Sequence, residues 1–575
     1  MLRSDDVDKG AKRSEHENRF DRQLRLWGAH GQKLLESTQI CALGSGPAIS
    51  EALKNLVLPN VNEFTIVDDK KVTEVDQGNN FFVAEEDIGK ARGDVVRENL
   101  LEMNPWNETE GIGVKGNFIN KNPDKAIESG LEDFKQYDVI LATEISDSNA
   151  LKLSTYCYEH NITFVLIRIN GLLGYIHWSK RQHLVTEEHP KDRDISDYHL
   201  HPEQLKNFPE LENYLKDFDF KKLGEDVFKH SRIPWPAITY HMRVKWQEEK
   251  KKTGPPSNFG ERNEFKQFIK GSAIAYMREK KLSFIEKNFE EAIMFAHKCC
   301  LKPVPDDEVQ AVLGADAAKN LTSESDNFWI VVHAINKFMG QEGNGFLPVT
   351  GEIKDMESTP ELYIRLQRTY QEQSKKEMAI IVKYAREAVS KLGKSADSIE
   401  DEYIVHVAKH IREAAVIKCK PISSVYDAKQ MDVDEIHEYF DEWEELPEWD
   451  EEENGPRPLR PKNIHWYFAL RAAERFRSKN GRYPGEGKYT FDDDVKELIK
   501  IQKAMFSEYS IERDMEEACL KEMVRSGGSQ IHNVAALIGG VVSQLCLKLI
   551  VRQFVPFNNT YVFNGVHTTS NVFQL

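Results

Sequence analysis

The sequence contains no long hydrophobic run and few cysteines. No stretch of about 18 apolar residues occurs, so we expect no segment that spans a membrane. The first residues are charged and carry no apolar secretory segment, which predicts a cytoplasmic or nuclear location. The seven cysteines are scattered and none forms a Cys-x-x-Cys pair, which argues against disulfides and against a structural zinc site. We therefore expect buried thiols and no metal ion bound by this chain.

Positive charge is also scarce. The chain has 77 Lys and Arg against 94 Asp and Glu, a net charge of −17. Attraction to phosphate needs a basic surface, so this balance disfavours general nucleic-acid binding. Much of the acidic excess lies in residues 430–460, together with Trp443 and Trp449. This segment fits either a solvated loop or an acidic interaction segment.

At 575 residues, the chain is long enough for several domains. After an N-terminus over 1–17 that we expect to be flexible, residues 18–180 alternate between helical and strand patterns. This alternation predicts an α/β domain with a largely parallel sheet and helices on both faces. Residues 181–525 read as a mostly helical insertion, and residues 526–575 return to the first domain with an apolar helix and two short strands.

A glycine-containing loop follows the first predicted strand. The loop reads Gly44-Ser45-Gly46-Pro47-Ala48-Ile49. Nucleotide-binding loops need glycines so that backbone N–H groups can approach phosphate at a helix N-terminus. Pro47 removes one N–H, and the residues after it add bulk. Asp68, at the end of the next strand, is placed to bind a ribose hydroxyl. The pattern therefore predicts a nucleotide-binding shell with a damaged pocket, and a dehydrogenase is a poor match.

The wider set of motifs resembles a known family. Arg19-x-x-Arg22-Gln23, the glycine loop, Asp68 and Asn104-Pro105 resemble the adenylation half of ubiquitin-activating-type enzymes. Further segments resemble the regulatory subunits of neddylation-activating enzymes, namely 53–59, 78–82, 288–292 and 557–561. The resemblance runs from about residue 17 to the C-terminus and departs at the long N-terminus and at 430–460. It implies a Rossmann-like adenylation fold of the ThiF/MoeB type, whose insertion forms half of a catalytic-cysteine-type domain.

The resemblance also implies a degenerate nucleotide site. The matching positions are Gly44, Gly46, Asp68, Asn79, Arg92 and Glu144. The loop keeps two of the family's four glycines. Asn79 replaces the phosphate-binding arginine of active members. Arg92 replaces a lysine, and Glu144 replaces an aspartate that helps hold magnesium. We therefore expect that this chain binds no cofactor and that ATP, magnesium and zinc belong to a catalytic partner.

Arg22 matches an arginine that, in this superfamily, crosses the dimer interface to the partner's ATP. A guanidinium placed on developing phosphoryl charge stabilises the transition state. Arg25, one turn further on, is expected to support the same face. Taken without the resemblance, Arg22 reads as a surface salt-bridge residue on the first helix.

Two stretches of the insertion match partner-contact regions of the family, residues 230–235 and 355–368. The predicted contact residues are Arg232, Asp355, Met356, Tyr363, Leu366 and Gln367. The family's thioester cysteine belongs to the catalytic subunit, and none of the seven cysteines matches its motif. Cys419, between two lysines, comes nearest to an activated setting.

These features together predict a regulatory subunit that pairs with a catalytic subunit. The pair would adenylate a Nedd/Rub-type ubiquitin-like protein and load it as a thioester for cullin modification, with no nucleic-acid or membrane partner. Two alternatives are a self-sufficient adenylating homodimer and a pure scaffold in which Arg22 has no role. The regulatory subunit for the SUMO modifier is a third, but its insertion is much shorter.

Overall fold

The computed structural model describes most of the chain, and its residues form two compact units. Described are residues 14–105, 112–188, 196–223, 226–273, 276–277, 283–284, 286–427, 429–441, 449–450, 455–456, 461–487, 490–513 and 516–575. Unit 1 comprises Met1–His183 and Ile417–Leu575, and unit 2 comprises Leu184–Val416. Each unit has its own hydrophobic cores.

Unit 1 is built on a mixed sheet with the order β13-β12-β6-β5-β4-β1-β2-β3. The strands are β1 (Gln39–Leu43), β2 (Glu63–Val67), β3 (Lys115–Ile119), β4 (Val139–Ala142), β5 (Thr163–Asn170), β6 (Leu173–Val185), β12 (Thr560–Asn564) and β13 (Thr569–Phe573). Strands β3, β2, β1, β4 and β5 are parallel, whereas β6 runs antiparallel to β5, β12 to β6, and β13 to β12. β9 (Ala415–Cys419) also pairs with β6. The predicted α/β class is confirmed.

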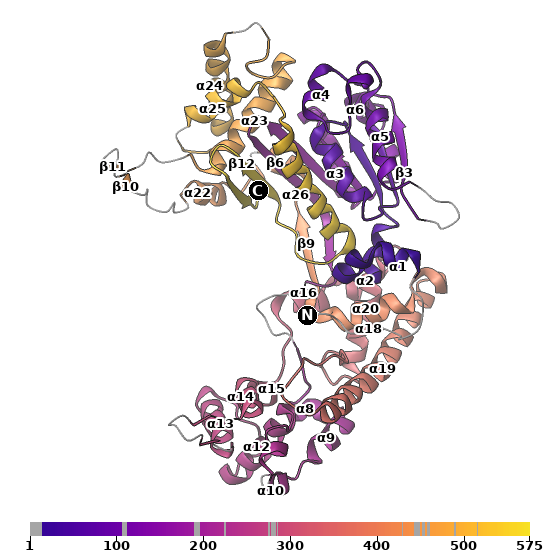
Figure 1. Cartoon of the computed structure of the whole chain (residues 1–575), viewed down its shortest axis with the longest axis vertical. Helices are drawn as coiled ribbons and strands as arrows, with labels where there is room; N and C mark the ends of the chain where they lie inside the picture. The colour runs from indigo at the N-terminus through magenta and orange to yellow at the C-terminus, as the bar shows by residue number, and fades with distance from the viewer. Residues whose placement is uncertain are drawn as a thin grey trace. The chain divides into compact units, whose positions relative to one another are not determined.

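Helices cover both faces of this sheet, and each layer of helices forms a hydrophobic core with the sheet. The side chains of β1 point alternately into these two cores. Cys41 and Leu43 belong to the core under α7 (Asp147–Glu159), α23 (Asn463–Asn480), α24 (Phe491–Glu508) and α25 (Glu517–Ser526). Ile40 and Ala42 belong to the core under α2 (Asp21–Leu35), α3 (Pro47–Val57), α5 (Arg92–Met103) and α26 (His532–Val551). Figure 1 shows α3 and α26 packed side by side. The carboxyl ends of the parallel strands and the start of α3 therefore frame the predicted pocket.

α26 is, among the described residues, the one helix that is long and apolar enough to cross a membrane by length and composition. Its most apolar window is 61% buried inside unit 1. At Gly539 the backbone of α26 meets α3 so closely that an added Cβ would lie 2.7 Å from the Ala48 carbonyl oxygen. This packing accounts for its apolar composition as that of a core helix.

The structure divides the chain differently from the boundaries expected from sequence. The first boundary, near residue 180, lies close to Leu184, but the chain rejoins unit 1 at Ile417 rather than at 526. α23, α24 and α25 pack apolar residues such as Trp466, Leu498 and Leu520 into the sheet's core. They therefore belong to unit 1, although their helical pattern resembles that of the insertion. Residues 1–13 and much of the acidic segment 430–460 lie outside the described residues.

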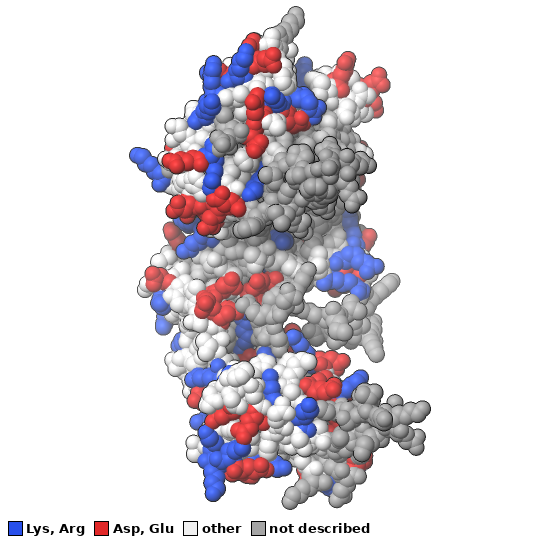
Figure 2. Space-filling model, turned by 90° about the vertical axis from the view of Figure 1, so that its left-hand side faces the viewer, with Lys and Arg blue, Asp and Glu red and all other residues white. Residues whose placement is uncertain are grey.

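Unit 2 is mostly helical. Its longer helices are α9 (Pro209–Lys216), α12 (Trp235–Lys250), α13 (Phe259–Ser272), α14 (Lys287–Met294), α16 (Asp307–Gly314), α18 (Asn327–Gly340), α19 (Pro360–Lys391) and α20 (Asp401–His410). α19 connects the two cores of the unit, because Leu366 and Tyr370 lie in one while Met378 and Ile381 lie in the other. On the face of the molecule shown in Figure 2, basic and acidic side chains are interspersed.

Candidate functional site

Arg92 lies at the centre of the predicted nucleotide pocket and ties three carboxylates together. It is the first residue of α5 and only 5% exposed. Its Nε and Nη2 donate to Asp68 Oδ2 at 3.0 and 2.8 Å, and its Nη1 donates to Asp76 Oδ1 at 3.0 Å. Nη2 also lies 2.8 Å from both oxygens of Glu144. One guanidinium therefore links the ends of β2 and β4 to α4 (Glu74–Asn79).

The charges of Arg92 and Glu144 favour each other's ionised state. Burial disfavours the charged forms, but the neighbouring carboxylates outweigh it and raise the pKa of Arg92 above its ordinary value. Likewise, burial would raise the pKa of Glu144, but the charges of Arg92 and Lys70 lower it. Lys70 Nζ lies 2.8 Å from Glu144 Oε2. Two cations thus face three carboxylates, and this local charge repels a triphosphate.

The glycine loop closes against the same cluster. Gly44 has a φ of +99°, and a Cβ added at Gly46 would lie 2.9 Å from Glu144 Oε1. The Ser45 hydroxyl donates to Asp68, the residue expected at the ribose, and accepts from Arg92 Nε at 3.1 Å. Pro47, the first residue of α3, offers no N–H to a phosphate. A carboxylate therefore borders the loop where a nucleotide phosphate would bind, and these residues do not fit ATP.

Asn79 is engaged within the chain rather than available to a phosphate. Its Nδ2 donates to the Gln530 carbonyl at 3.0 Å, and its own carbonyl lies 3.2 Å from Nδ1 of His532, at the start of α26. Next to it, Phe81 is 70% exposed, with its ring centroid 6.4 Å from that of His532. The structure thus brings five of the six predicted pocket positions into one cluster around Arg92. Asn79 lies beside this cluster and connects α4 to the start of α26 through its hydrogen bonds.

Asp76 and Lys70 are members of this cluster that the sequence analysis missed. Asp76 also closes a capping box with Thr73 at the start of α4, and Thr73-x-x-Asp76 is the sequence signal for that local role. Its long-range bond to Arg92 has no local signal. Lys70 lies three residues after the end of β2, near the strand end where pocket residues are expected.

Arg22 is exposed on α2, and no hydrogen bond or ion pair joins it to another described residue. Arg25, one turn on, pairs instead with Asp21, with 2.9 Å between Nε and Oδ2. The helix that carries them is anchored further along, where Gln32 donates to the Pro59 carbonyl at 2.9 Å. Between the two parts, Gly28 adopts a φ of 68° and kinks the helix. Arg22 therefore projects from a fixed element with its guanidinium available.

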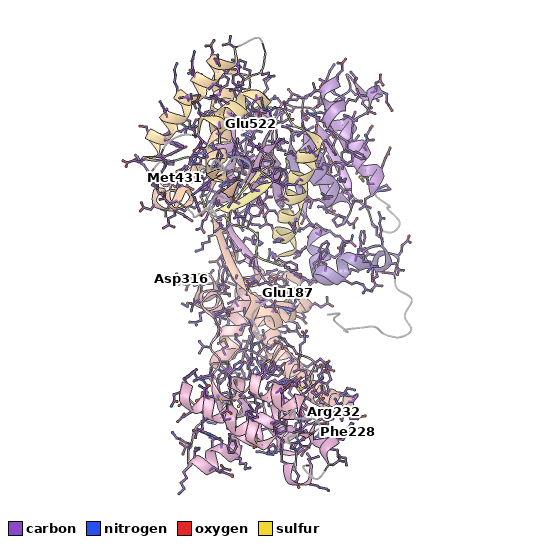
Figure 3. The ribbon with its side chains drawn as sticks, turned by 60° about the vertical axis from the view of Figure 1, so that its left-hand side comes forward. Glu187, Phe228, Arg232, Asp316, Met431 and Glu522 are labelled. Carbon is purple, nitrogen blue, oxygen red and sulfur yellow. The ribbon has the colours of Figure 1, made fainter. Side chains whose placement is uncertain are left out.

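The predicted partner-contact residues of unit 2 differ in exposure. Arg232 forms an ion pair with Glu357 and lies 5.7 Å from the ring centroid of Phe228; Figure 3 labels both Arg232 and Phe228. Asp355 is exposed and Gln367 is partly exposed, whereas Met356 and Leu366 are buried in the core. The Tyr363 hydroxyl donates to the Ile353 carbonyl at 3.1 Å. Their contacts with a partner stay a prediction, and Leu366 contributes to the core of unit 2.

All seven cysteines are free and buried. Cys419 is 1% exposed, and burial raises the pKa of its thiol to about 12. A nucleophilic thiol needs exposure and a low pKa. Cys419 has neither, in spite of its two lysine neighbours.

Comparison with known proteins identifies the family of the chain. Residues 20–575 match the ThiF family. The chain is 32% identical to the NEDD8-activating enzyme E1 regulatory subunit of Danio rerio, over 98% of this chain and 99% of the relative. It is 33% identical to the subunit of the same name from Gallus gallus, over 97% and 98%. It is also 33% identical to the NEDD8-activating enzyme E1 regulatory subunit AXL of Arabidopsis thaliana, over 98% and 100%. The chain belongs to the ThiF family and, within it, to the family of NEDD8-activating enzyme E1 regulatory subunits.

Proposed function

We propose that this chain forms a heterodimer with a catalytic subunit that carries out the adenylation of a NEDD8-type protein. The observation that supports this division of labour is the Arg92 cluster. The chain's own pocket is filled by an internal guanidinium bound to three carboxylates, so the nucleotide and its magnesium ion belong to the partner. This chain then contributes through its surface rather than through its pocket.

Within that heterodimer, Arg22 places its guanidinium on the phosphates of the partner's ATP. The exposure of Arg22 supports this role. Its guanidinium forms no hydrogen bond with another described residue, so it can form charge-assisted hydrogen bonds to phosphate. Arg25 supports the helix through Asp21. The partner then forms the thioester, since the buried thiols of this chain do not suit that step.

The experiment is ATP–pyrophosphate exchange by the reconstituted heterodimer with a NEDD8-type protein. Arg22→Ala is expected to lower the exchange rate at least tenfold, which is about 1.4 kcal/mol of barrier. Lys33→Ala removes the same charge from an exposed site on the same helix and is the control, expected to keep the wild-type rate.

Two other outcomes would contradict the proposal. Unchanged exchange by Arg22→Ala in an intact heterodimer would favour the pure scaffold. Exchange by this chain alone would favour a self-sufficient homodimer.

A further inference from the structure

Three side chains of unit 2 bring metal-ligand atoms together away from the pocket. They are Glu187, just after β6, and His406 and His410 on α20 (Glu187 is labelled in Figure 3). Their ligand atoms all lie within 4.8 Å of one another. The two histidines are four residues apart, so they lie on the same side of the helix. Their ring centroids are 4.8 Å apart.

The distances place one carboxylate between the two imidazoles. Glu187 Oε2 lies 4.0 Å from His406 Nε2, and Glu187 Oε1 lies 3.9 Å from His410 Nδ1. Both distances exceed those of a direct hydrogen bond. A tetrahedral zinc ion with ligands at about 2.0–2.1 Å separates its ligand atoms by about 3.3 Å. Small rotations of these side chains would bring the three donors to that separation.

A fourth donor lies beside them. Glu413, at the end of the 3-10 turn η4 (Ile411–Glu413), places Oε1 3.4 Å from His410 Nδ1. Two neutral imidazoles and the carboxylate of Glu187 supply three of the four ligands of a tetrahedral zinc ion, and a water molecule or a reoriented Glu413 supplies the fourth. The three grouped donors come from the segment after β6 and from α20, and Glu413 of η4 lies beside His410.

The surroundings favour a bound ion. The side chain of Glu187 is 2% exposed and that of His410 is 10% exposed, while His406 at 19% leaves an entry path. Leu184, Val407 and Ile411, next to the ligands in sequence, are buried in the hydrophobic core of this part of unit 2.

We propose that Glu187, His406 and His410 form a site for zinc or a chemically similar divalent ion, with Glu413 beside it. The site fastens α20 to the segment in which the chain enters unit 2. It differs from the sequence-based expectation of no metal, which rested on the lack of cysteine pairs. The competing reading is an ion-pair cluster in which a protonated histidine neutralises Glu187.

The test uses the purified full-length chain, stripped with a chelator and titrated with Co²⁺ and then Zn²⁺. The wild type is expected to take up one equivalent of Co²⁺ with the visible absorption of a four-coordinate ion, and Zn²⁺ should displace it. Uptake should weaken at acidic pH, because imidazole must be neutral to bind a metal. Bound zinc should also raise the thermal unfolding midpoint.

Variants separate the two readings. His406→Gln and Glu187→Gln should each weaken metal binding at least tenfold, whereas His297→Gln, at an exposed histidine of the same unit, should bind like the wild type. If Glu187→Gln fails to fold, His406→Gln decides, because His406 is the more exposed ligand. Equal binding by wild type and His406→Gln, or no Co²⁺ uptake by the folded wild type, would overturn the metal site and favour the ion-pair cluster.

Discussion

Arg92 and Glu144 lie at the ends of different elements, yet one guanidinium nitrogen of Arg92 is 2.8 Å from both carboxylate oxygens of Glu144. In the family pattern these positions hold a lysine that contacts ATP and an aspartate that helps hold magnesium. Here the two side chains bind each other. Because this contact is part of the protein's own structure, the stability of the fold should depend on both side chains.

The first prediction concerns that dependence. Arg92→Met should destabilise unit 1 by about 3–5 kcal/mol, because it leaves three carboxylates, two of them buried and one largely buried, without their main counter-charge. Denaturant unfolding measures the change. Arg97→Met is the control on the same helix, and its partly exposed pair with Asp94 should contribute no more than about 1 kcal/mol. Equal unfolding curves for the two variants would show that the cluster is energetically unimportant.

The second prediction is a pH dependence in unit 2. Burial, with Asp355 nearby, raises the pKa of Glu291 on α14 to about 7. A carboxyl whose folded-state pKa lies above its unfolded value of 4.5 contributes stability below that value and loses it as the pH rises through 7. Glu291→Gln cannot ionise, so it should lose less stability than the wild type between pH 5.5 and 8.

Thermal unfolding at the two pH values measures this difference. Glu290→Gln, at the neighbouring residue of the same helix, is the control and should follow the wild type. Asp355→Asn should shift the loss of stability to lower pH, since it removes the negative charge that helps to raise the pKa of Glu291. A wild-type pH profile in Glu291→Gln would exclude Glu291 as the titrating group.

The sequence predicted the sheet domain well because its signals are local. The buried runs of β1, β2, β4 and β5 are short and apolar, and the glycine loop and Asp68 follow strands directly. The sequence signal for β3 is weaker, because β3 is a short edge strand whose side chains are exposed or half-exposed. The return to unit 1 at Ile417 was missed because helical periodicity does not reveal which core a helix packs against.

The degenerate site was predictable in part. The sequence showed which residues replace the family's ligands, but it could not show that Arg92 turns inward to bind Asp68, Asp76 and Glu144. These partners lie 16 to 52 positions away in the chain, and their meeting depends on the assembled fold. The cluster of Glu187, His406 and His410 could not be predicted from the sequence either, because Glu187 lies far from α20 in the chain.

The third prediction tests the surface next to the filled pocket. Phe81 exposes 70% of its surface beside His532, and an exposed aromatic ring is a common anchor in protein interfaces. If the catalytic subunit covers this face, Phe81→Ser should raise the dissociation constant of the heterodimer at least tenfold, as measured by calorimetry. Phe259→Ser, at a 73% exposed residue of unit 2, is the control. An unchanged dissociation constant would place the interface elsewhere.

The fourth prediction uses two adjacent glycines of α26 that have opposite surroundings. A Cβ at Gly539 would lie 2.7 Å from both the Ala48 carbonyl oxygen and the Glu51 Cβ of α3, so Gly539→Ala should destabilise unit 1 by about 1–3 kcal/mol through overpacking. A Cβ at Gly540 would meet nothing within 4 Å, so Gly540→Ala should stabilise the helix by up to about 1 kcal/mol. Denaturant unfolding of the two variants should therefore show shifts of opposite sign. Shifts of the same sign would mean that α26 does not pack against α3 through Gly539, and the apolar composition of α26 would need another explanation.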